Sequence, residues 1–412
     1  MNSIIASLRH FTGAASPGLG IVGLVSLAHG ATHWINATFL VLLPFIARDF
    51  GLSYTETGSL MTLFYVATFF TNVASGPAAD ISGRFVGLLV VSLLVGGASL
   101  VILGISSGAI GVVVTVVLIG VSISMWHPPS ISYLSRCYPE ARGLALSLHT
   151  VGASLGDLIA PPVAGLLMTL LAWQETALLS SLPLFVVAAA VYFTLGELER
   201  PAREAGAASV SARYLEGARL LVRDRVFLRL CVMSGLWSMS QNGVALFLPL
   251  YLVGELAAGP ATVGVALAAI QVGAIVTGPL AGAWSDRIGR RPVTVTALGV
   301  GAAAIAALPF IGGLVSFIVV VAIVGCALFA IRPVIHGWTM DLTGTRMPGS
   351  AVSMVFAFQA GMNMALPVIS GMVADAWGLA VVFHLMMVTC VAAAALALSM
   401  PNSPAQPARA AA

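Results

Sequence analysis

Polar side chains that could do chemistry lie inside long apolar segments of this sequence. Asp157 is the only acidic residue in the interior of any segment that we expect to be embedded in apolar surroundings. His29, His33 and Asn36 occupy positions i, i+4 and i+7, which place them on one face of a helix. Histidine changes its charge between about pH 5 and 8. A carboxylate and two histidines in such surroundings could accept and relay protons, or contact a polar ligand.

Other apolar segments carry a second group of candidates. His127 and Arg332 are each followed by proline, and His149 precedes Asp157 by about two helical turns. The guanidinium of Arg332 could bind phosphonate or carboxylate oxygens, or it could latch two parts of the protein together. The remaining polar candidates for the same site are Gln241, Asn242, Gln359 and Asn363. The alternative for all of these residues is structural hydrogen bonding between helices.

The composition defines the elements that must position these side chains. Of 412 residues, 59% are hydrophobic and only 8% are charged, whereas a soluble protein is about one quarter charged. Soluble enzymes, nucleic-acid binders and disordered scaffolds are therefore excluded. The apolar runs are continuous and helix-long, unlike the alternating strands of a membrane β-barrel. The sequence predicts an all-α polytopic membrane protein.

At about 20 apolar residues per span, the chain divides into twelve transmembrane helices. We expect an N-terminal six-helix half over 1–195 and a C-terminal half with a short cytoplasmic tail over 226–412. A cytoplasmic linker over 196–225 contains an expected surface-lying amphipathic helix at 212–221. The expected spans are 20–46, 56–79, 84–104, 108–135, 142–170, 175–195, 226–253, 261–284, 292–312, 314–340, 349–373 and 378–399.

The two halves repeat at a spacing of 205 or 206 residues. Asp80 and Gly83 match Asp286 and Gly289, and Pro44 matches Pro249. The candidate residues repeat in the same register, with Asn36 matching Gln241, His127 matching Arg332, and Asp157 matching Asn363. An ordered set of matches indicates two structurally equivalent halves, which suits a carrier with a site between them.

Several motifs resemble those of the major facilitator superfamily. They are Gly282-x3-Asp286-Arg287-x-Gly289-Arg290-Arg291, its weaker copy at 76–84, and the six-plus-six layout. A narrower resemblance is to the fosmidomycin-resistance type of permease, through three further segments. These are His29 with Leu42-Leu43-Pro44, Trp126-His127-Pro128, and the run from Arg142-Gly143 to Gly152-x3-Gly156. The chain departs from that type in having His33 where an acidic residue is frequent, and Asp157 where proline is frequent.

The resemblance implies an efflux carrier. Together with Asp157, His127 and Arg332, it leads us to expect a secondary active transporter that exports a small neutral or anionic compound or drug in exchange for protons, by alternating access. It gives a conformational gating role to six residues at helix ends, which are Asp80, Arg84, Asp286, Arg287, Arg290 and Arg291. Proton-coupled uptake of a small organic anion is the alternative within transport, and a receptor or scaffold that no longer transports is the alternative outside it.

The expected partners are the substrate, protons and membrane lipids, and the expected state is a monomer. Nucleic acid is not an expected partner. Motifs of hydrolases, metalloproteases and nucleotide-binding loops do not occur, so no enzyme activity and no cofactor are expected. The four cysteines (Cys137, Cys231, Cys326 and Cys390) have no paired spacing, so no metal site is expected either.

The charge distribution predicts the orientation in a bacterial inner membrane. All 18 basic residues other than histidine are arginine, and sixteen of them fall on one side when the N-terminus is cytoplasmic. Positive charges in short loops mark the cytoplasmic side, so both termini should be cytoplasmic. A reporter fused after Arg203 should therefore behave as cytoplasmic, whereas a fusion after Ser107 should behave as periplasmic. A periplasmic signal after Arg203 would reverse the orientation.

Overall fold

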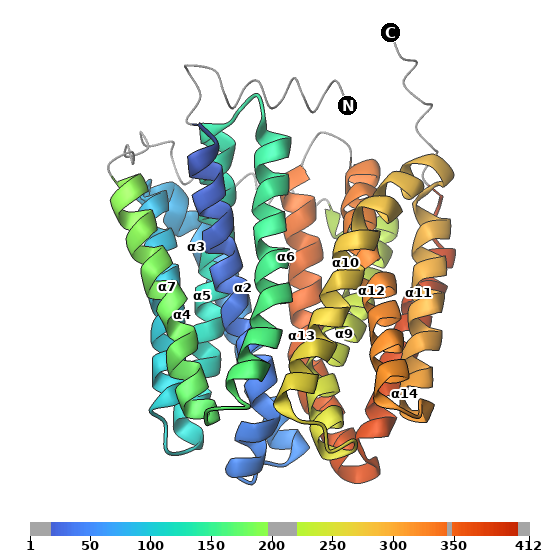
Figure 1. The fold of residues 1–412 in the computed structure, drawn as a ribbon. Helices are drawn as coiled ribbons and strands as arrows, with labels where there is room; N and C mark the ends of the chain where they lie inside the picture. Colours follow the sequence, from blue (N-terminus) through green and yellow to red (C-terminus); the bar gives the residue numbers. More distant parts are fainter. Residues whose placement is uncertain (1–17, 197–220, 344–347, 403–412) are drawn as a thin grey trace. The chain divides into compact units, whose positions relative to one another are not determined.

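The computed structural model describes residues 18–196, 221–343 and 348–402, and within these ranges the chain is built from α-helices without strands (Figure 1). Twelve α-helices are present in this part of the chain. Each coincides with one of the expected spans to within a few residues, so the predicted all-α polytopic fold class is confirmed. Most of the expected linker, including nearly all of the amphipathic helix at 212–221, lies outside the described residues.

The chain divides into two compact units. The first contains residues up to Phe50 and from Leu63 to Ala207, and the second contains Gly51–Thr62 and the chain from Ala208 onward. Helix α3 (Tyr54–Ser82) begins in the second unit and continues in the first. The other helices of the first unit are α2 (Gly18–Asp49), α4 (Phe85–Gly104), α5 (Ala109–Cys137), α6 (Arg142–Leu167) and α7 (Trp173–Leu195).

The second unit contains six further helices. They are α9 (Arg225–Gly254), α10 (Pro260–Ile288), α11 (Arg290–Ala307), α12 (Leu314–Thr343), α13 (Pro348–Trp377) and α14 (Leu379–Leu398). Helix α11 is shorter than expected because a 3₁₀ turn, Leu308–Phe310, follows it. Pro309 lies in that turn, and proline cannot donate the backbone hydrogen bond that would continue an α-helix.

Ten of the described helices are long and apolar enough to cross a membrane. The two others, α3 and α9, are of similar length at 29 and 30 residues. They carry more polar side chains along their length, such as Thr62 and Asn72 in α3 and Ser238 and Gln241 in α9. The apolar surface of the other ten makes this a multi-pass membrane protein.

Equivalent pairs of helices pack against each other in the two units. In the first, α2 packs against α6 and α7, and α4 packs against α5 and α7; Figure 1 shows α2 beside α6. In the second, α9 packs against α13 and α14, and α11 packs against α12 and α14. The sequence repeat relates these pairs one to one, so the two units share one packing scheme.

Acidic residues cap or end several helices. The carboxylate of Asp375, near the end of α13, accepts hydrogen bonds from the backbone amides of Tyr54 and Thr55, both at 2.9 Å. The Thr55 hydroxyl donates to the same carboxylate at 2.6 Å. Asp375 therefore caps the start of α3, where the unsatisfied amides and the helix dipole favour a negative charge.

The expectation that only one acid lies within a span is wrong, because the helices are longer than expected. Asp49, Asp286, Asp341 and Asp375 all fall inside helices that can cross a membrane. Each of them is within three residues of a helix end. Asp157 differs from them because it lies in the middle of α6. Among the described residues it is the only helical acid more than three residues from an end.

Candidate functional site

Four histidines and Asp157 gather in the first unit. His29 and His33 come from α2, His127 from α5, and His149 and Asp157 from α6. The ring centroid of His29 is 4.9 Å from that of His33, 5.2 Å from that of His127 and 3.8 Å from that of His149. We call these five residues the histidine cluster. The structure thus brings together residues that the sequence distributes over more than 120 positions.

Glycines allow α2 and α6 to approach closely enough to form this cluster. A Cβ atom added at Gly152 would collide with the backbone carbonyl of Ser26, and one at Gly156 would collide with the carbonyl of Gly30. A Cβ at Gly30 would lie 2.7 Å from the carbonyl oxygen of Gly152. Small residues spaced four apart are typical of close helix contacts in membranes. The run from Gly152 to Gly156 therefore has a packing role.

The hydrogen bonds of the α2 and α5 histidines share one pattern. His29 donates from Nδ1 to the carbonyl oxygen of His149 at 2.8 Å, and His127 donates from Nδ1 to the carbonyl of Ile123 at 2.7 Å. A carbonyl only accepts, so the proton of each neutral ring is on Nδ1 and the lone pair is on Nε2.

His33 makes the contact with the acid of the cluster. Its Nδ1 lies 2.9 Å from Oδ2 of Asp157, and the side chains are 21% and 24% exposed. The carboxylate accepts from the imidazole, so Nδ1 again carries the proton. If the ring is protonated, the same contact is an ion pair. This contact gives the membrane-embedded carboxylate the partner that it needs in apolar surroundings.

His149 has the opposite tautomer. The Ser130 hydroxyl lies 3.0 Å from the carbonyl of His127 and 3.0 Å from Nε2 of His149. The hydroxyl has one proton, and it donates this proton to the carbonyl of His127, which can only accept. Nε2 of His149 is therefore the donor to the Ser130 oxygen. Nδ1 of His149 is buried and has no hydrogen-bond partner among the described residues. His149 therefore supports its neighbours through both its backbone and its ring.

The second unit repeats this arrangement with uncharged side chains. Asn363, the counterpart of Asp157, donates to the hydroxyl of Ser238 at 2.8 Å, and Gln359 donates to the hydroxyl of Ser234 at 2.5 Å. Ser238 and Ser234 are the counterparts of His33 and His29 at a spacing of 205 residues. The α9–α13 contact is therefore a neutral version of the α2–α6 contact.

The other predicted site residues have contacts of different kinds. Asn242 donates to the carbonyl of Ser238 on its own helix at 2.9 Å. Nε2 of Gln241 and Oδ1 of Asn36 are buried without a hydrogen-bond partner among the described residues. Arg332 lies in α12 with its guanidinium 5.9 Å from the centroid of the Phe329 ring. Asn36 belongs to the first unit and the other three to the second, and the role of all four in substrate binding stays a prediction.

Arg290 forms a charged network at the end of α10 and the start of α11. Its guanidinium pairs with Asp286 at 2.5 Å and with Asp341 at 3.0 Å, and it donates to the Ser285 hydroxyl at 2.6 Å. Gly337 makes room, because a Cβ atom there would lie 2.7 Å from the Arg290 guanidinium carbon. The network joins α10, α11 and α12 at one end, a position suited to the predicted gating role.

The other gating candidates differ in their surroundings. Gly83 and Gly289 both have positive φ, at 62° and 100°, so the repeated loops share a turn that favours glycine. The backbone amide of Arg291 donates to Asn402, and its guanidinium reaches the carbonyl of Met400 at 3.4 Å. Arg84 is exposed at the start of α4, and Arg287 is exposed in the last turn of α10. The side chain of Asp80 lies outside the described part of the structure.

Two residues of interest, Asp341 and His336, were not predicted from the sequence. Asp341 was missed because the expected span ended at 340, although it is the only acid between Asp286 and Asp375 and thus the available partner for an arginine. His336 packs against Phe356 with ring centroids 5.6 Å apart. Its position one turn after Arg332 was the signal that could have identified it.

Comparison with known proteins agrees with this architecture. The family model of the Major Facilitator Superfamily matches residues 25–353 and 230–412. The fosmidomycin resistance protein of Escherichia coli is 24% identical over 164 residues. That match spans 40% of each of the two chains.

Solved structures show the same fold. One is a bacterial homologue of the human lysosomal transporter Spinster, inward-facing and unoccupied, with a TM-score of 0.77, 16% identity, and coverage of 92% of this chain and 96% of that one. Another is the peptide transporter POT in a mutant form, with a TM-score of 0.75, 14% identity, and coverage of 95% and 97%.

The chain belongs to the Major Facilitator Superfamily, since the family model covers most of its length. Together with its long apolar helices, this makes it a multi-pass membrane protein of that superfamily. The resemblance noted from the sequence motifs, both to the superfamily and to the fosmidomycin-resistance type, is confirmed.

The glycine contacts between α2 and α6 lead to a testable prediction. Gly152→Ala and Gly156→Ala should force these helices apart, lower the melting temperature of the purified protein by several degrees and separate His33 from Asp157. Gly143→Ala is the matched control in the same helix, because a Cβ atom there meets nothing within 4 Å. Equal melting temperatures for all three variants, measured in detergent, would show that the close approach does not stabilise the unit.

Proposed function

We propose that this protein is a proton-coupled antiporter that exports a small neutral or anionic organic compound by alternating access. The observation that carries the proposal is the contact between His33 and Asp157 in the middle of α2 and α6. A carboxylate at the centre of a membrane helix costs about 2.5–3.5 kcal/mol to insert, and ionisable groups placed there in transporters commonly serve as proton relays. The contact supplies a carboxylate and an imidazole that can exchange a proton directly.

The direction of transport rests on the similarity to a protein named for resistance to fosmidomycin. A carrier that protects a cell from a compound does so by moving that compound outward, and a proton gradient directed inward supplies the free energy for such exchange. Export across a bacterial inner membrane, with both termini cytoplasmic, is consistent with the positions of the arginines.

The charge that we propose for the substrate rests on the charged and titratable side chains within the membrane helices of each unit. Arg332 in α12 carries a fixed positive charge, and the histidine cluster carries four imidazoles for a single carboxylate. A fixed guanidinium in apolar surroundings attracts anions more strongly than it would at a surface, because the effective dielectric constant is lower. A phosphonate, a carboxylate or a weakly acidic drug fits these charges better than a lipophilic cation does.

Everted membrane vesicles provide the test of direction and coupling. Their lumen becomes acidic when they are energised, so a proton antiporter accumulates its substrate inside them, whereas a proton symporter does not. We expect accumulation of a phosphonate or carboxylate compound, loss of that accumulation with a protonophore, and no accumulation of a lipophilic cation. Accumulation only in right-side-out vesicles would identify an uptake carrier instead, and binding without accumulation in either would identify a receptor.

Asp157→Asn should abolish gradient-driven accumulation while leaving the protein folded, because the amide cannot carry the proton. The matched control is Glu175→Gln at the start of α7, where the side chain accepts a hydrogen bond from the Ala172 amide and glutamine can do the same. Size-exclusion profiles and melting temperatures of both variants should match those of the unmodified protein. Accumulation against a gradient by Asp157→Asn would place proton coupling elsewhere.

A further inference from the structure

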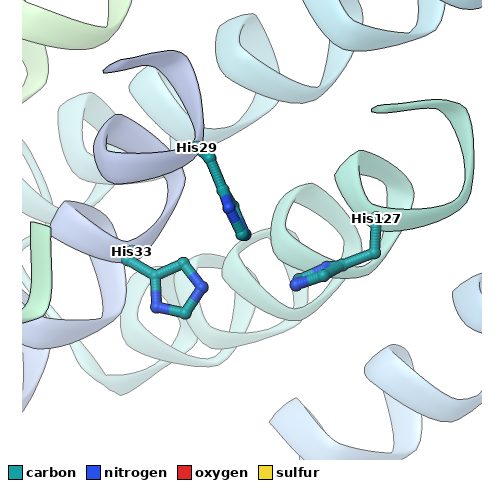
Figure 2. A group of neighbouring side chains, drawn as sticks. All are labelled: His29, His33 and His127. Atoms are coloured by element: carbon teal, nitrogen blue, oxygen red, sulfur yellow. The ribbon is translucent and has the colours of Figure 1, made fainter. Parts of the chain in front are cut away.

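The histidine cluster has the geometry of a metal site. One nitrogen from each of His29, His33 and His127 lies within 4.8 Å of the corresponding nitrogens of the other two. Figure 2 shows the three side chains extending from α2 and α5 toward a common space. We propose that these three imidazoles bind a divalent transition-metal ion such as Zn²⁺ through their Nε2 atoms. This inference goes beyond the proposed transport of an organic compound.

The first support for the site is the position of the ring protons. All three histidines donate from Nδ1, to the carbonyl of His149, to the carboxylate of Asp157 and to the carbonyl of Ile123. Metal-binding histidines commonly have this arrangement, in which an acceptor holds the Nδ1 proton and leaves the Nε2 lone pair for the ion. The contact between His33 and Asp157 is the carboxylate–histidine pair that raises the basicity of a ligating imidazole.

The second support is the burial of His29. The residue is only 6% exposed, and its Nε2 has no hydrogen-bond partner among the described residues. A buried nitrogen with a lone pair and no donor costs free energy, so the site gains stability when that lone pair meets an ion or a proton donor. The ring of Trp126 lies nearly parallel to that of His29, with centroids 6.2 Å apart.

The chemistry of the donors selects the metal. Imidazole nitrogen suits Zn²⁺, Cu²⁺, Ni²⁺ and Co²⁺, whereas Ca²⁺ and Mg²⁺ require oxygen ligands. In a tetrahedral zinc site, ligand nitrogens about 2.0–2.1 Å from the ion are about 3.3 Å apart, so binding requires the three rings to move inward by at most about 1 Å. Three protein ligands leave a fourth position for water.

Sequence patterns alone predicted no metal site, because zinc motifs are recognised by short spacings. Here His29 and His33 have the i, i+4 spacing of two ligands on one helix, but the third ligand comes from α5, far along the chain. The expectation of no metal site rested on the spacing of the cysteines and did not consider the histidines.

The test uses the full-length protein in detergent after removal of any histidine tag. Titration with Co²⁺ should produce the visible absorption bands of a tetrahedral site at one ion per chain, and Zn²⁺ should displace it and raise the melting temperature. His29→Gln and His127→Gln should each weaken Zn²⁺ binding at least ten-fold. Asp157→Asn should weaken it by about 10–100-fold, since it removes the acceptor that orients His33.

The matched control is His384→Gln in α14, whose ring hydrogen-bonds to the carbonyl of Ala380 one turn earlier in the same helix. This variant should bind Zn²⁺ as the unmodified protein does. If His29→Gln does not fold, the half-buried position of His127 provides the second variant. Absence of cobalt bands, or unchanged affinity in both His29→Gln and His127→Gln, would overturn the site. Because binding is measured without a gradient or an organic substrate, such a failure would not affect the proposed transport activity.

Discussion

The close approach of α2 and α6 is the constraint on which the histidine cluster depends. Gly30, Gly152 and Gly156 bring two backbones into contact where any side chain would separate them. Only then can a ring on α2 reach the backbone of α6, as His29 does at His149, and a second ring reach Asp157. In membranes, where apolar side chains gain little from leaving lipid, such backbone contacts and hydrogen bonds between helices carry much of the association.

The repeat shows what is special about the first unit. Both units join the equivalent helices through polar pairs, but α9 and α13 use serine, asparagine and glutamine where α2 and α6 use histidine and aspartate. Neutral pairs are sufficient to hold two helices together. The cost of placing ionisable groups in the α2–α6 contact is therefore the basis on which we propose a role for them beyond packing.

Much of this arrangement could be predicted from the sequence, and the rest could not for physical reasons. Hydropathy located every described helix, because about 20 apolar residues must span a bilayer. Helical spacing placed His29 and His33 on one face, and the repeat paired Asp157 with Asn363. Spacing within one helix says nothing about its neighbour, so the contacts of His33 with Asp157 and of Arg290 with Asp341 needed the structure. The expected spans stopped before the acids at several helix ends, because hydropathy detects the apolar part of a helix and not its polar terminal turns.

The central claim is that hydrogen-bond acceptors on α6 fix the ring protons of His29 and His33 on Nδ1. A backbone carbonyl of α5 does the same for His127. Nitrogen-15 chemical shifts of labelled histidine, measured in lipid bilayers and assigned with single histidine-to-glutamine variants, report directly which ring nitrogen carries the proton. The account predicts a protonated Nδ1 and an unprotonated Nε2 for these three rings, and the reverse for His149. Protonated Nε2 atoms in His29 and His33 would contradict it, because the contacts with His149 and Asp157 could then not form as described.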